Sequence, residues 1–455
     1  MIRTVAGIVA PEAVAQVLPH EHVLHRITAH AAPTATTNNS SSTSVAPSSS
    51  LNGIRNEDLQ AYRVSPLALG GQNLVLEKED EAFRELEILG QAFKDDRAHA
   101  RPLVVDVTLP IEGRDTFMAT RVQVAQKANV HVAVVTTCAF EKIAATFPMG
   151  LSPIDQSERL AKVMETELMF GFTAANSEGA LNAAQIGAGA IYQQIHVTTH
   201  ILEEKDTILA RGIALAQCRT HAPVYLSFSF DTTTKSEQQQ CILAWIHELL
   251  RHDAKSDKIV VCHMDRWSDD NDANTAFLQT LLHLGVNLLF NMIGLSTVSD
   301  VALINPCITA STAATFEPPR DRTIANCVAR LIHQQGSNLN QLLISTTLQQ
   351  RIQYQRYGGG GYAYLDTFFK QRLLQHHDIS DTQLQQLTTG NPLRLLSWYA
   401  PPAAPDVPKE YLKCSICKQD FEPIVGEYFT KFAYTYCGTK CLRRHSRRGF
   451  TPLDP

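Results

Sequence analysis

Short apolar runs rich in β-branched residues alternate along most of the chain with longer stretches in which apolar residues recur three and four positions apart. The runs are typical of buried strands, and the longer stretches are typical of helices that pack on a sheet. Helices are predicted, among others, over 80–93, 115–128, 239–253 and 273–285. The eight runs that predict strands are VLPHEHV (17–23), PLVVDVTL (102–109), VHVAVVTTC (130–138), GAIYQQIHV (189–197), PVYLSFSF (223–230), KIVVCHM (258–264), VNLLFNM (286–292) and QLLISTT (341–347).

Strands that alternate with helices predict parallel pairing through crossover connections. Eight such units over this length favour an α/β fold of the closed (β/α)8 type, a TIM barrel. An open, doubly wound sheet is the alternative, but no Gly-x-Gly-x-x-Gly motif follows the first predicted strand, which removes the most direct support for a dinucleotide site.

Two segments interrupt this pattern. Residues 31–51, AAPTATTNNSSSTSVAPSSSL, have almost nothing to bury and predict a low-complexity insertion. Residues 399–408, YAPPAAPDVP, predict an extended Pro/Ala linker that cannot continue a helix. The predicted organisation is a barrel over 1–398, a linker over 399–408 and a small domain over 409–450.

Composition narrows the class of protein. The 455 residues are 44% hydrophobic and carry a formal net charge of −5 with the two signs mixed along the chain, so no global field favours nucleic acid or a membrane surface. We find neither a secretory signal pattern nor an apolar run near the roughly 18 residues of a membrane span. We therefore predict a soluble, cytoplasmic protein without a membrane partner.

Two histidines, His20 and His22, stand together in the first predicted strand. Side chains alternate along a strand, so both point to the same side, and barrel active sites form at the C-terminal ends of the strands. Imidazole nitrogens at this spacing can share one zinc ion. Taken alone the pair is as typical of packed or surface histidines, but His263 at the end of the sixth predicted strand favours a metal site.

Five motifs in order along the chain resemble the phosphotriesterase-related branch of the amidohydrolase superfamily. The resemblance covers most of residues 1–399 and implies a barrel of amidohydrolase type with two divalent metals, usually zinc. These metals activate a bridging water for attack on an ester, phosphoester or amide. The motifs are VLPHEHV (17–23), VDVTLPIEGRD (105–115), VCHMDRWSDD (261–270), QYQRYGGGGYAYL (353–365) and TTGNPLRLLSW (388–398).

The resemblance places three metal ligands of the family on His20, His22 and His263. Three other ligand positions of the family are lost. The bridging lysine or glutamate of the fourth strand, the histidine of the fifth and the aspartate of the eighth fall on Gln194, Ser227 and Thr347, respectively.

These losses remove the anionic half of a two-metal site. Two divalent cations a few Å apart repel strongly, and Gln194 offers only a neutral carbonyl as a bridge. The hydroxyl of Thr347 is not a base near neutral pH. One metal on His20, His22 and His263, with an open position, stays conceivable.

For such a one-metal site the candidate base is Asp265, in the same motif as His263. Glu21 should point away from its histidine neighbours because side chains alternate along a strand. His196 and His200, which follow the fourth strand, are either stand-in ligands or, more simply, solvated loop histidines.

The C-terminal segment carries a second metal motif, Cys414-x2-Cys417 followed by Cys437-x3-Cys441-x3-His445. Two cysteine pairs supply four soft ligands in tetrahedral reach, and so short a segment has too few apolar residues to fold without a metal. We predict a structural zinc in a finger that resembles a treble clef. His445 is a fifth candidate, which gives a Cys3His site if one cysteine is free. The alternative, reduced cysteines in an unstructured tail, leaves six aromatic residues between the pairs unexplained.

The partner of this finger is less specific. Its last helix offers four arginines that could contact a nucleic-acid backbone or simply be solvated. Short fingers of this kind often bind proteins, so a protein partner is favoured and nucleic acid is the alternative. The arginines are Arg443, Arg444, Arg447 and Arg448.

Two functions follow from the sequence. The first is a degenerate metallohydrolase barrel, catalytically impaired or inactive, that acts as a scaffold or binds a small molecule at its mouth and carries a zinc finger for interaction. The second is a zinc-dependent hydrolase with a reduced metal site, acting on an ester, phosphoester or acyl-amide. The metal content of the barrel separates them.

Overall fold

The computed structural model describes residues 1–27, 54–66, 70–94, 100–172, 186–198, 201–230, 234–304, 314–334, 338–401, 411–422 and 428–451. The chain forms two compact units, Met1–Tyr399 and Ala400–Pro455. The predicted insertion at 31–51, the linker from 402 to 408 and His200 lie outside the described residues.

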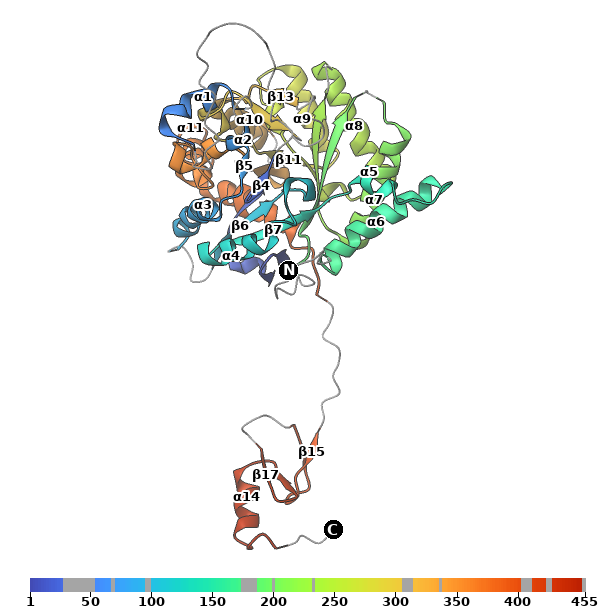
Figure 1. The fold of residues 1–455 in the computed structure, drawn as a ribbon, viewed down its shortest axis with the longest axis vertical. Helices are drawn as coiled ribbons and strands as arrows, with labels where there is room; N and C mark the ends of the chain where they lie inside the picture. Colours follow the sequence, from blue (N-terminus) through green and yellow to red (C-terminus); the bar gives the residue numbers. More distant parts are fainter. Residues whose placement is uncertain are drawn as a thin grey trace, which may run out of the picture. The chain divides into compact units, whose positions relative to one another are not determined.

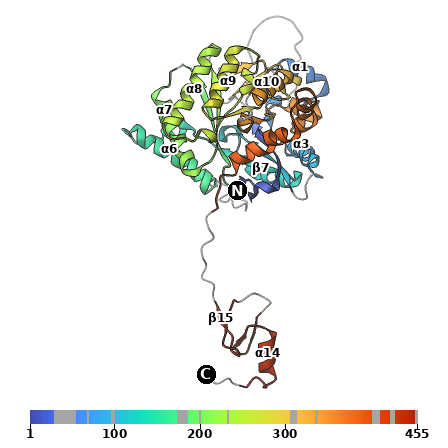
Figure 2. The ribbon, with the colours of Figure 1, turned by 180° about the vertical axis from the view of Figure 1, so that it is seen from behind.

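Eight parallel strands form the centre of the first unit, each paired with the next along the chain, and helices surround them (Figures 1 and 2). This arrangement confirms the predicted α/β barrel and every predicted strand. The strands are β3 (Val14–Glu21), β6 (Arg101–Asp106), β7 (His131–Thr136), β8 (Ala190–Val197), β9 (Val224–Phe230), β10 (Ile259–Val261), β11 (Asn287–Phe290) and β14 (Leu342–Ile344).

Among the described residues, four helices begin at a capping side chain, Ser152, Thr234, Asn271 or Ser380. Thr234, for example, accepts a hydrogen bond from the backbone of Glu237 and starts the helix that follows β9. The longer helices are α3 (Glu79–Ala92), α4 (Met118–Ala128), α6 (Pro153–Met169), α7 (Glu204–Thr220), α8 (Lys235–Arg251), α9 (Asp272–His283) and α10 (Asp321–Gln334). The shorter ones are α1 (Leu59–Val64), α2 (Gly70–Asn73), α5 (Phe140–Ala144), α11 (Lys370–His376), α12 (Asp381–Gln385) and α13 (Asn391–Leu396).

Alternation along the strands separates two apolar cores. On β6, Leu103 and Val105 belong to the cluster inside the barrel, whereas Val104 belongs to the larger cluster between strands and helices. Ile2, from the hairpin of β1 (Ile2–Thr4) and β2 (Gly7–Val9), and Leu395 of α13 also belong to the inner cluster. The strand pairs β4 (His25–Arg26) with β5 (Val75–Leu76) and β12 (Ala302–Ile304) with β13 (Ala314–Phe316) lie outside the barrel sheet.

Glu21 connects the first and last strands of the barrel, β3 and β14, which stand at opposite ends of the strand order. Its carboxylate is fully buried, and its hydrogen bonds go to the β14 end. Oε1 accepts from the hydroxyls of Ser345 (2.6 Å) and Thr346 (2.7 Å) and from the backbone N–H groups of Thr346 (2.8 Å) and Thr347 (3.1 Å). Oε2 accepts from the backbone N–H of Leu348 at 2.7 Å. One side chain therefore holds the last strand end against the first.

We expect Glu21→Gln to lower the free energy of unfolding of the barrel by about 3 kcal/mol, because the amide turns a donor toward groups that need an acceptor. Urea unfolding followed by tryptophan fluorescence measures this loss. Glu12→Gln makes the same change at an exposed position and should stay within about 0.5 kcal/mol of the native chain. Equal losses in the two variants would show that Glu21 does not hold the junction.

The second unit is small and built around two hairpins and one helix. Its elements are β15 (Leu412–Lys413), β16 (Asp420–Phe421), β17 (Phe429–Lys431), β18 (Tyr434–Tyr436) and α14 (Thr439–Ser446). β15 pairs with β16 and β17 with β18, both antiparallel. The loop between β15 and β16 and the start of α14 carry the cysteine pairs.

Candidate functional site

Polar side chains from six strands of the barrel meet at the carboxyl ends of those strands. Parallel pairing brings these ends to the same side, where active sites of this fold form. Apart from Gln194, each of these side chains is at most 4% exposed. We call the set the mouth cluster, and its members are His20 (β3), His22 (after β3), Gln194 (β8), Ser227 (β9), His263 (after β10), Asn291 (after β11) and Thr347 (after β14).

The three histidines predicted as metal ligands are neighbours. The ring centroids of His20 and His263 are 5.3 Å apart, and those of His20 and His22 are 6.2 Å apart. Their ligand nitrogens do not all lie within 4.8 Å of one another. In the part of the chain that the structure describes, one group of three or more His, Cys, Asp or Glu residues meets this spacing. That group is the four cysteines of the second unit, so the histidines are brought together without forming a preassembled site.

Asn291 lies between the histidines, and sequence reasoning missed it. Its Oδ1 accepts the backbone N–H of His263 at 2.7 Å. Its Nδ2 donates to the hydroxyl of Thr347 at 2.6 Å and to Nδ1 of His263 at 3.1 Å, and lies 3.4 Å from Nδ1 of His20. Because a backbone donor occupies Oδ1, the NH2 end of the amide must face the rings.

The orientation of this amide decides where His263 carries its proton. Nδ1 faces a donor and must accept, so the neutral imidazole carries its proton on Nε2. Nε2 lies 2.8 Å from the hydroxyl oxygen of Ser227 and donates to it. Neither ring nitrogen of His263 therefore keeps a lone pair for a metal ion.

His20 and His22 are less fully engaged. Nδ1 of His20 lies 3.0 Å from the hydroxyl of Thr347, and its Nε2 is buried with no hydrogen-bond partner among the described residues. Nδ1 of His22 lies 3.2 Å from the hydroxyl of Thr108, in the loop after β6. The one buried ring nitrogen of the mouth cluster without a partner is thus Nε2 of His20.

Burial keeps these histidines neutral. Desolvation lowers the pKa of His20 well below its usual value, and the nearby His263 and His22 lower it further. Desolvation, with a contribution from Arg266, lowers the pKa of His263 to about 3. At neutral pH both rings are neutral imidazoles, so hydrogen bonds rather than ion pairs order the cluster.

Two residues of the cluster have backbone conformations that non-glycine residues rarely adopt. His263 has φ 60° and Thr347 has φ 44°, both in the left-handed region. For a β-branched residue such as Thr347 this conformation is an outlier, and it persists where the surrounding contacts determine it. The hydrogen bonds of Thr347 to Asn291 and His20 are such contacts.

Gln194 connects the cluster to a buried carboxylate. Its Nε2 lies 3.4 Å from Oε1 of Glu112, a fully buried residue in the loop after β6. Tyr192 hydrogen-bonds to both Ser227 and Gln194, and its ring lies 5.4 Å from that of His20. Burial raises the pKa of Tyr192, so this phenol also stays neutral.

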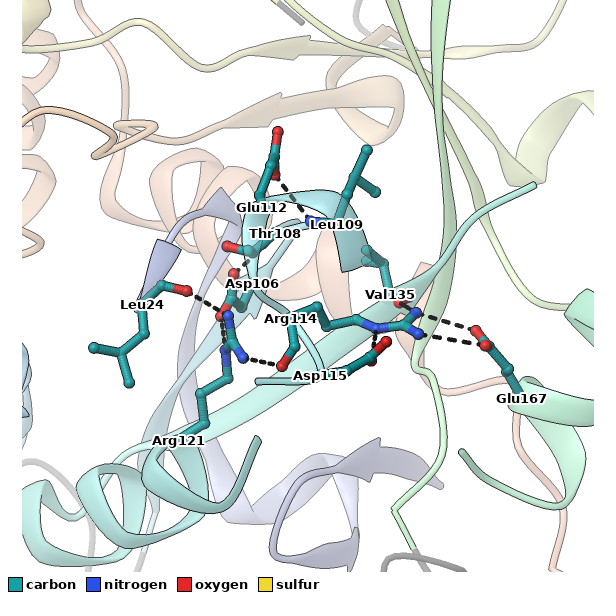
Figure 3. Close-up of polar contacts among 10 residues, drawn as sticks. All are labelled: Leu24, Asp106, Thr108, Leu109, Glu112, Arg114, Asp115, Arg121, Val135 and Glu167. Atoms are coloured by element: carbon teal, nitrogen blue, oxygen red, sulfur yellow. Dashed lines mark hydrogen bonds and ion pairs between the residues drawn. The ribbon is translucent and has the colours of Figure 1, made fainter. Parts of the chain in front are cut away.

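A buried ion pair holds the loop after β6 in place. Arg121 of α4 pairs with Asp106 at the end of β6, and neither side chain is exposed. Arg121 also donates to the backbone carbonyls of Leu24 and Arg114 (Figure 3). Asp106 in turn accepts the backbone N–H of Thr108 at 3.0 Å, so this pair positions the hydroxyl that contacts His22.

The neighbouring Arg114 orders the same loop. Its guanidinium contacts Asp115 at 2.7 Å, Glu167 at 3.1 Å and the carbonyl of Val135 at 2.9 Å (Figure 3). The contacts with Val135 and Glu167 fasten the loop to β7 and α6.

Asp265 is occupied by backbone groups. Its two carboxylate oxygens accept the N–H groups of Asn291 (2.8 Å) and Met292 (3.2 Å). Burial raises the pKa of Asp265 to about 7, against the lowering effect of these donors. The structure thus gives Asp265, the candidate base, a role in shaping the chain after β11.

His196 pairs through Nδ1 with the hydroxyl of Ser229 at 3.1 Å.

The side chains of the mouth cluster do not fit a pair of divalent cations. Such a pair needs an anionic bridge, and the bridging and terminal positions that the resemblance implies hold Gln194 and Thr347, which are neutral. His263, which should supply a ligand, has committed both ring nitrogens to Asn291 and Ser227.

The second unit contains a compact cluster of four cysteines. Cys414, Cys417, Cys437 and Cys441 place their sulfur atoms within 4.8 Å of one another. Burial would raise the pKa of Cys414, but backbone hydrogen bonds from Cys417, Cys437 and Ile416 outweigh it and lower that pKa to about 6. A low thiol pKa favours the thiolate that binds zinc. The predicted four-cysteine zinc site is therefore consistent with the structure.

His445, the fifth candidate, belongs to the core of this unit instead. It is fully buried, and its Nε2 donates to the carbonyl of Thr451 at 2.9 Å. Its Nδ1 lies 2.9 Å from the hydroxyl of Tyr436, which must donate to it. Both nitrogens are used, so a Cys3His site would require breaking one of these bonds.

Two family models match the chain. The phosphotriesterase family matches residues 1–396, and the Vms1-associating treble clef domain matches residues 409–453. No curated protein matches the chain significantly.

Solved structures similar to the chain share the barrel. A resiniferatoxin-binding protein from Rhodobacter sphaeroides has 22% identity and a TM-score of 0.62, covering 88% of this chain and 96% of that one. A phosphotriesterase homology protein from Escherichia coli, complexed with phosphate in its active site, has 17% identity and a TM-score of 0.55, with 84% and 98% covered. A lactonase from Listeria monocytogenes has 14% identity and a TM-score of 0.54, with 88% and 99% covered. At these identities the likeness establishes the fold.

Within the described residues, no helix is both long and apolar enough to cross a membrane.

Proposed function

The chain belongs to the phosphotriesterase family, and from this premise we propose that its barrel is a non-hydrolytic member. We further propose that the protein works as a scaffold whose treble clef domain binds a protein partner. Location in the cytoplasm is part of the same proposal.

The observation that carries the proposal is the state of the mouth cluster. Where the family reaction needs metal ligands and a carboxylate, Ser227, His263, Asn291 and Thr347 form a continuous series of hydrogen bonds between neutral groups. A neutral hydroxyl at Thr347 cannot accept the proton of an attacking water. The cluster is also buried, which leaves little surface for a substrate.

We expect the purified full-length protein to hydrolyse activated aryl esters, lactones and phosphotriesters no faster than buffer, with or without added zinc. Metal analysis should find zinc only at the level of the four-cysteine site. A zinc-dependent turnover that disappears in both His20→Ala and His263→Ala would overturn the proposal, because it would show a working metal at these rings. His283→Ala, on the outer helix α9, is the control substitution.

One observation favours a second candidate, a one-metal hydrolase or a small-molecule binder. Nε2 of His20 is buried and has no hydrogen-bond partner among the described residues, and His20 is a neutral imidazole, the form that binds metals. The fold neighbours include a resiniferatoxin-binding protein and lactonases, so this barrel serves both kinds of function elsewhere. In this alternative His20, His22 and His263 hold the metal and Asp265 is the base, which requires Asn291 and Asp265 to give up their present hydrogen bonds.

The treble clef presents side chains that suit a protein interface. Phe432, at the turn between β17 and β18, is 76% exposed, and Tyr411 is 59% exposed. Lys431 lies over the ring of Phe450, with Nζ 4.1 Å from the ring centroid. Exposed aromatic rings are typical anchors of protein interfaces.

We expect fluorescence anisotropy to show no binding of labelled single-stranded or duplex oligonucleotides to the full chain at physiological salt. Binding that weakens steeply with salt and is lost in the variant R443A/R444A/R447A/R448A would favour nucleic acid as the partner instead. Removing the exposed ring in Phe432→Ser gives the matched variant for a protein partner, since it leaves the four cysteines unchanged.

A further inference from the structure

We propose that Asn291 blocks a one-metal site at the barrel mouth. Its amide takes the place of an acidic ligand and prevents a cation from binding to Nδ1 of His20 and Nδ1 of His263. This inference rests on the proposed non-hydrolytic function and names the residue that enforces it. It goes beyond the sequence hypothesis, in which the family ligands lost at Gln194, Ser227 and Thr347 explain the missing metals.

Three polar atoms lie close to one nitrogen of the amide. Nδ2 lies 2.6 Å from Oγ1 of Thr347, 3.1 Å from Nδ1 of His263 and 3.4 Å from Nδ1 of His20. The NH2 group is the positive end of the amide and has hydrogens but no lone pair to offer a cation. Its two hydrogens go to the hydroxyl of Thr347 and to Nδ1 of His263, which a metal ion would otherwise bind, and the same nitrogen lies against Nδ1 of His20.

The distances around Nδ2 match those between ligand atoms of a zinc site. Zinc bonds of about 2.0–2.1 Å in tetrahedral geometry separate neighbouring ligand atoms by roughly 3.3–3.4 Å. Nδ2 stands 3.1 Å from the ring nitrogen of His263 and 3.4 Å from that of His20, close to this separation. An oxygen in the place of Nδ2 would stand at ligand-to-ligand distance from each of the two ring nitrogens.

The amide cannot turn to offer its own oxygen. Oδ1 accepts a hydrogen bond from the backbone N–H of His263 at 2.7 Å. His263 has a left-handed backbone conformation. Turning the amide would set its NH2 group against this N–H and leave both donors unpaired, which is costly in a buried site. One side chain thus closes the site through both of its ends.

Asn291→Asp tests this inference directly. One carboxylate oxygen can keep the backbone N–H of His263 while the other faces the two rings. We expect this variant of the full-length protein to retain one equivalent of zinc more than the native chain after dialysis, by elemental analysis. Competition with a chromophoric chelator should show at least 100-fold tighter zinc binding at this extra site than in the native barrel.

Two controls define the site. Adding His263→Ala to the variant should abolish the extra equivalent. Asn287→Asp makes the same change at the start of β11, where the amide donates to the carbonyls of Asp257 and Ile259 instead, and should add no zinc. If Asn291→Asp does not fold without metal, Asn291→Cys supplies a ligand that is neutral until it binds, and should show the same extra equivalent.

Folded Asn291→Asp and Asn291→Cys proteins that take up no extra zinc would overturn the inference. So would a native barrel that already holds a zinc lost in His263→Ala. By contrast, a native barrel without metal that still hydrolyses esters would overturn the proposed function and leave this inference intact.

Discussion

Cys414→Ser is expected to unfold the treble clef domain while the melting transition of the barrel stays within experimental error. The four sulfur atoms lie within 4.8 Å of one another, and among the described residues of this unit only Cys414, Tyr436 and His445 are buried. Zinc binding by short fingers contributes on the order of 10–16 kcal/mol to their folding, so loss of one thiolate removes most of the stabilisation. The barrel is a separate compact unit and should not respond.

Limited proteolysis, elemental analysis and proton NMR measure the outcome. The variant should lose its zinc, and residues from about 411 onward should be cleaved quickly at a protease concentration that spares the barrel. A strong zinc chelator should reproduce the same pattern in the native chain. Cys218→Ser, in the barrel, makes the same change at a half-buried thiol and should leave the domain resistant. A zinc-free Cys414→Ser chain with a protease-resistant C-terminal domain would contradict the structural role of the metal.

The second large effect is expected at the ion pair beneath the mouth of the barrel. Arg121→Met should lower the free energy of unfolding by about 3–5 kcal/mol, because it leaves Asp106 ionised and unpaired where neither side chain is exposed. The carbonyls of Leu24 and Arg114 lose their donors as well. Since Asp106 positions Thr108, whose hydroxyl contacts His22, the change should also shift the NMR signals of His22.

Urea unfolding of the barrel measures this loss, and Lys127→Met provides the comparison. Lys127 lies on the same helix and pairs with Glu79 at 2.8 Å, but both side chains are exposed. An exposed pair contributes about 0–1 kcal/mol, so this variant should unfold almost like the native chain. Similar losses in the two variants would mean that burial adds nothing to the pair of Arg121 and Asp106.

The sequence determined the architecture and the location of the candidate sites. The eight strands were predictable because runs such as VHVAVVTTC are buried on both faces. The helices were predictable because their apolar residues recur with a period of about 3.6 residues. The spacing of Cys414, Cys417, Cys437 and Cys441 predicted the sulfur cluster because a metal restricts which spacings can fold. Strand-end positions likewise predicted that His20 and His263 would be neighbours, and the distance of 5.3 Å between their ring centroids confirms this.

Tertiary structure alone decided what the histidines can do. Asn291 follows a buried strand like many other asparagines, and its NH2 group faces the histidine rings only because the backbone N–H of His263, which follows another strand, fixes its oxygen. His445 had suitable spacing for a ligand, but Tyr436 and Thr451 occupy its nitrogens. Proton positions on a ring and the direction of an amide depend on partners that are distant in sequence, and no local pattern records them.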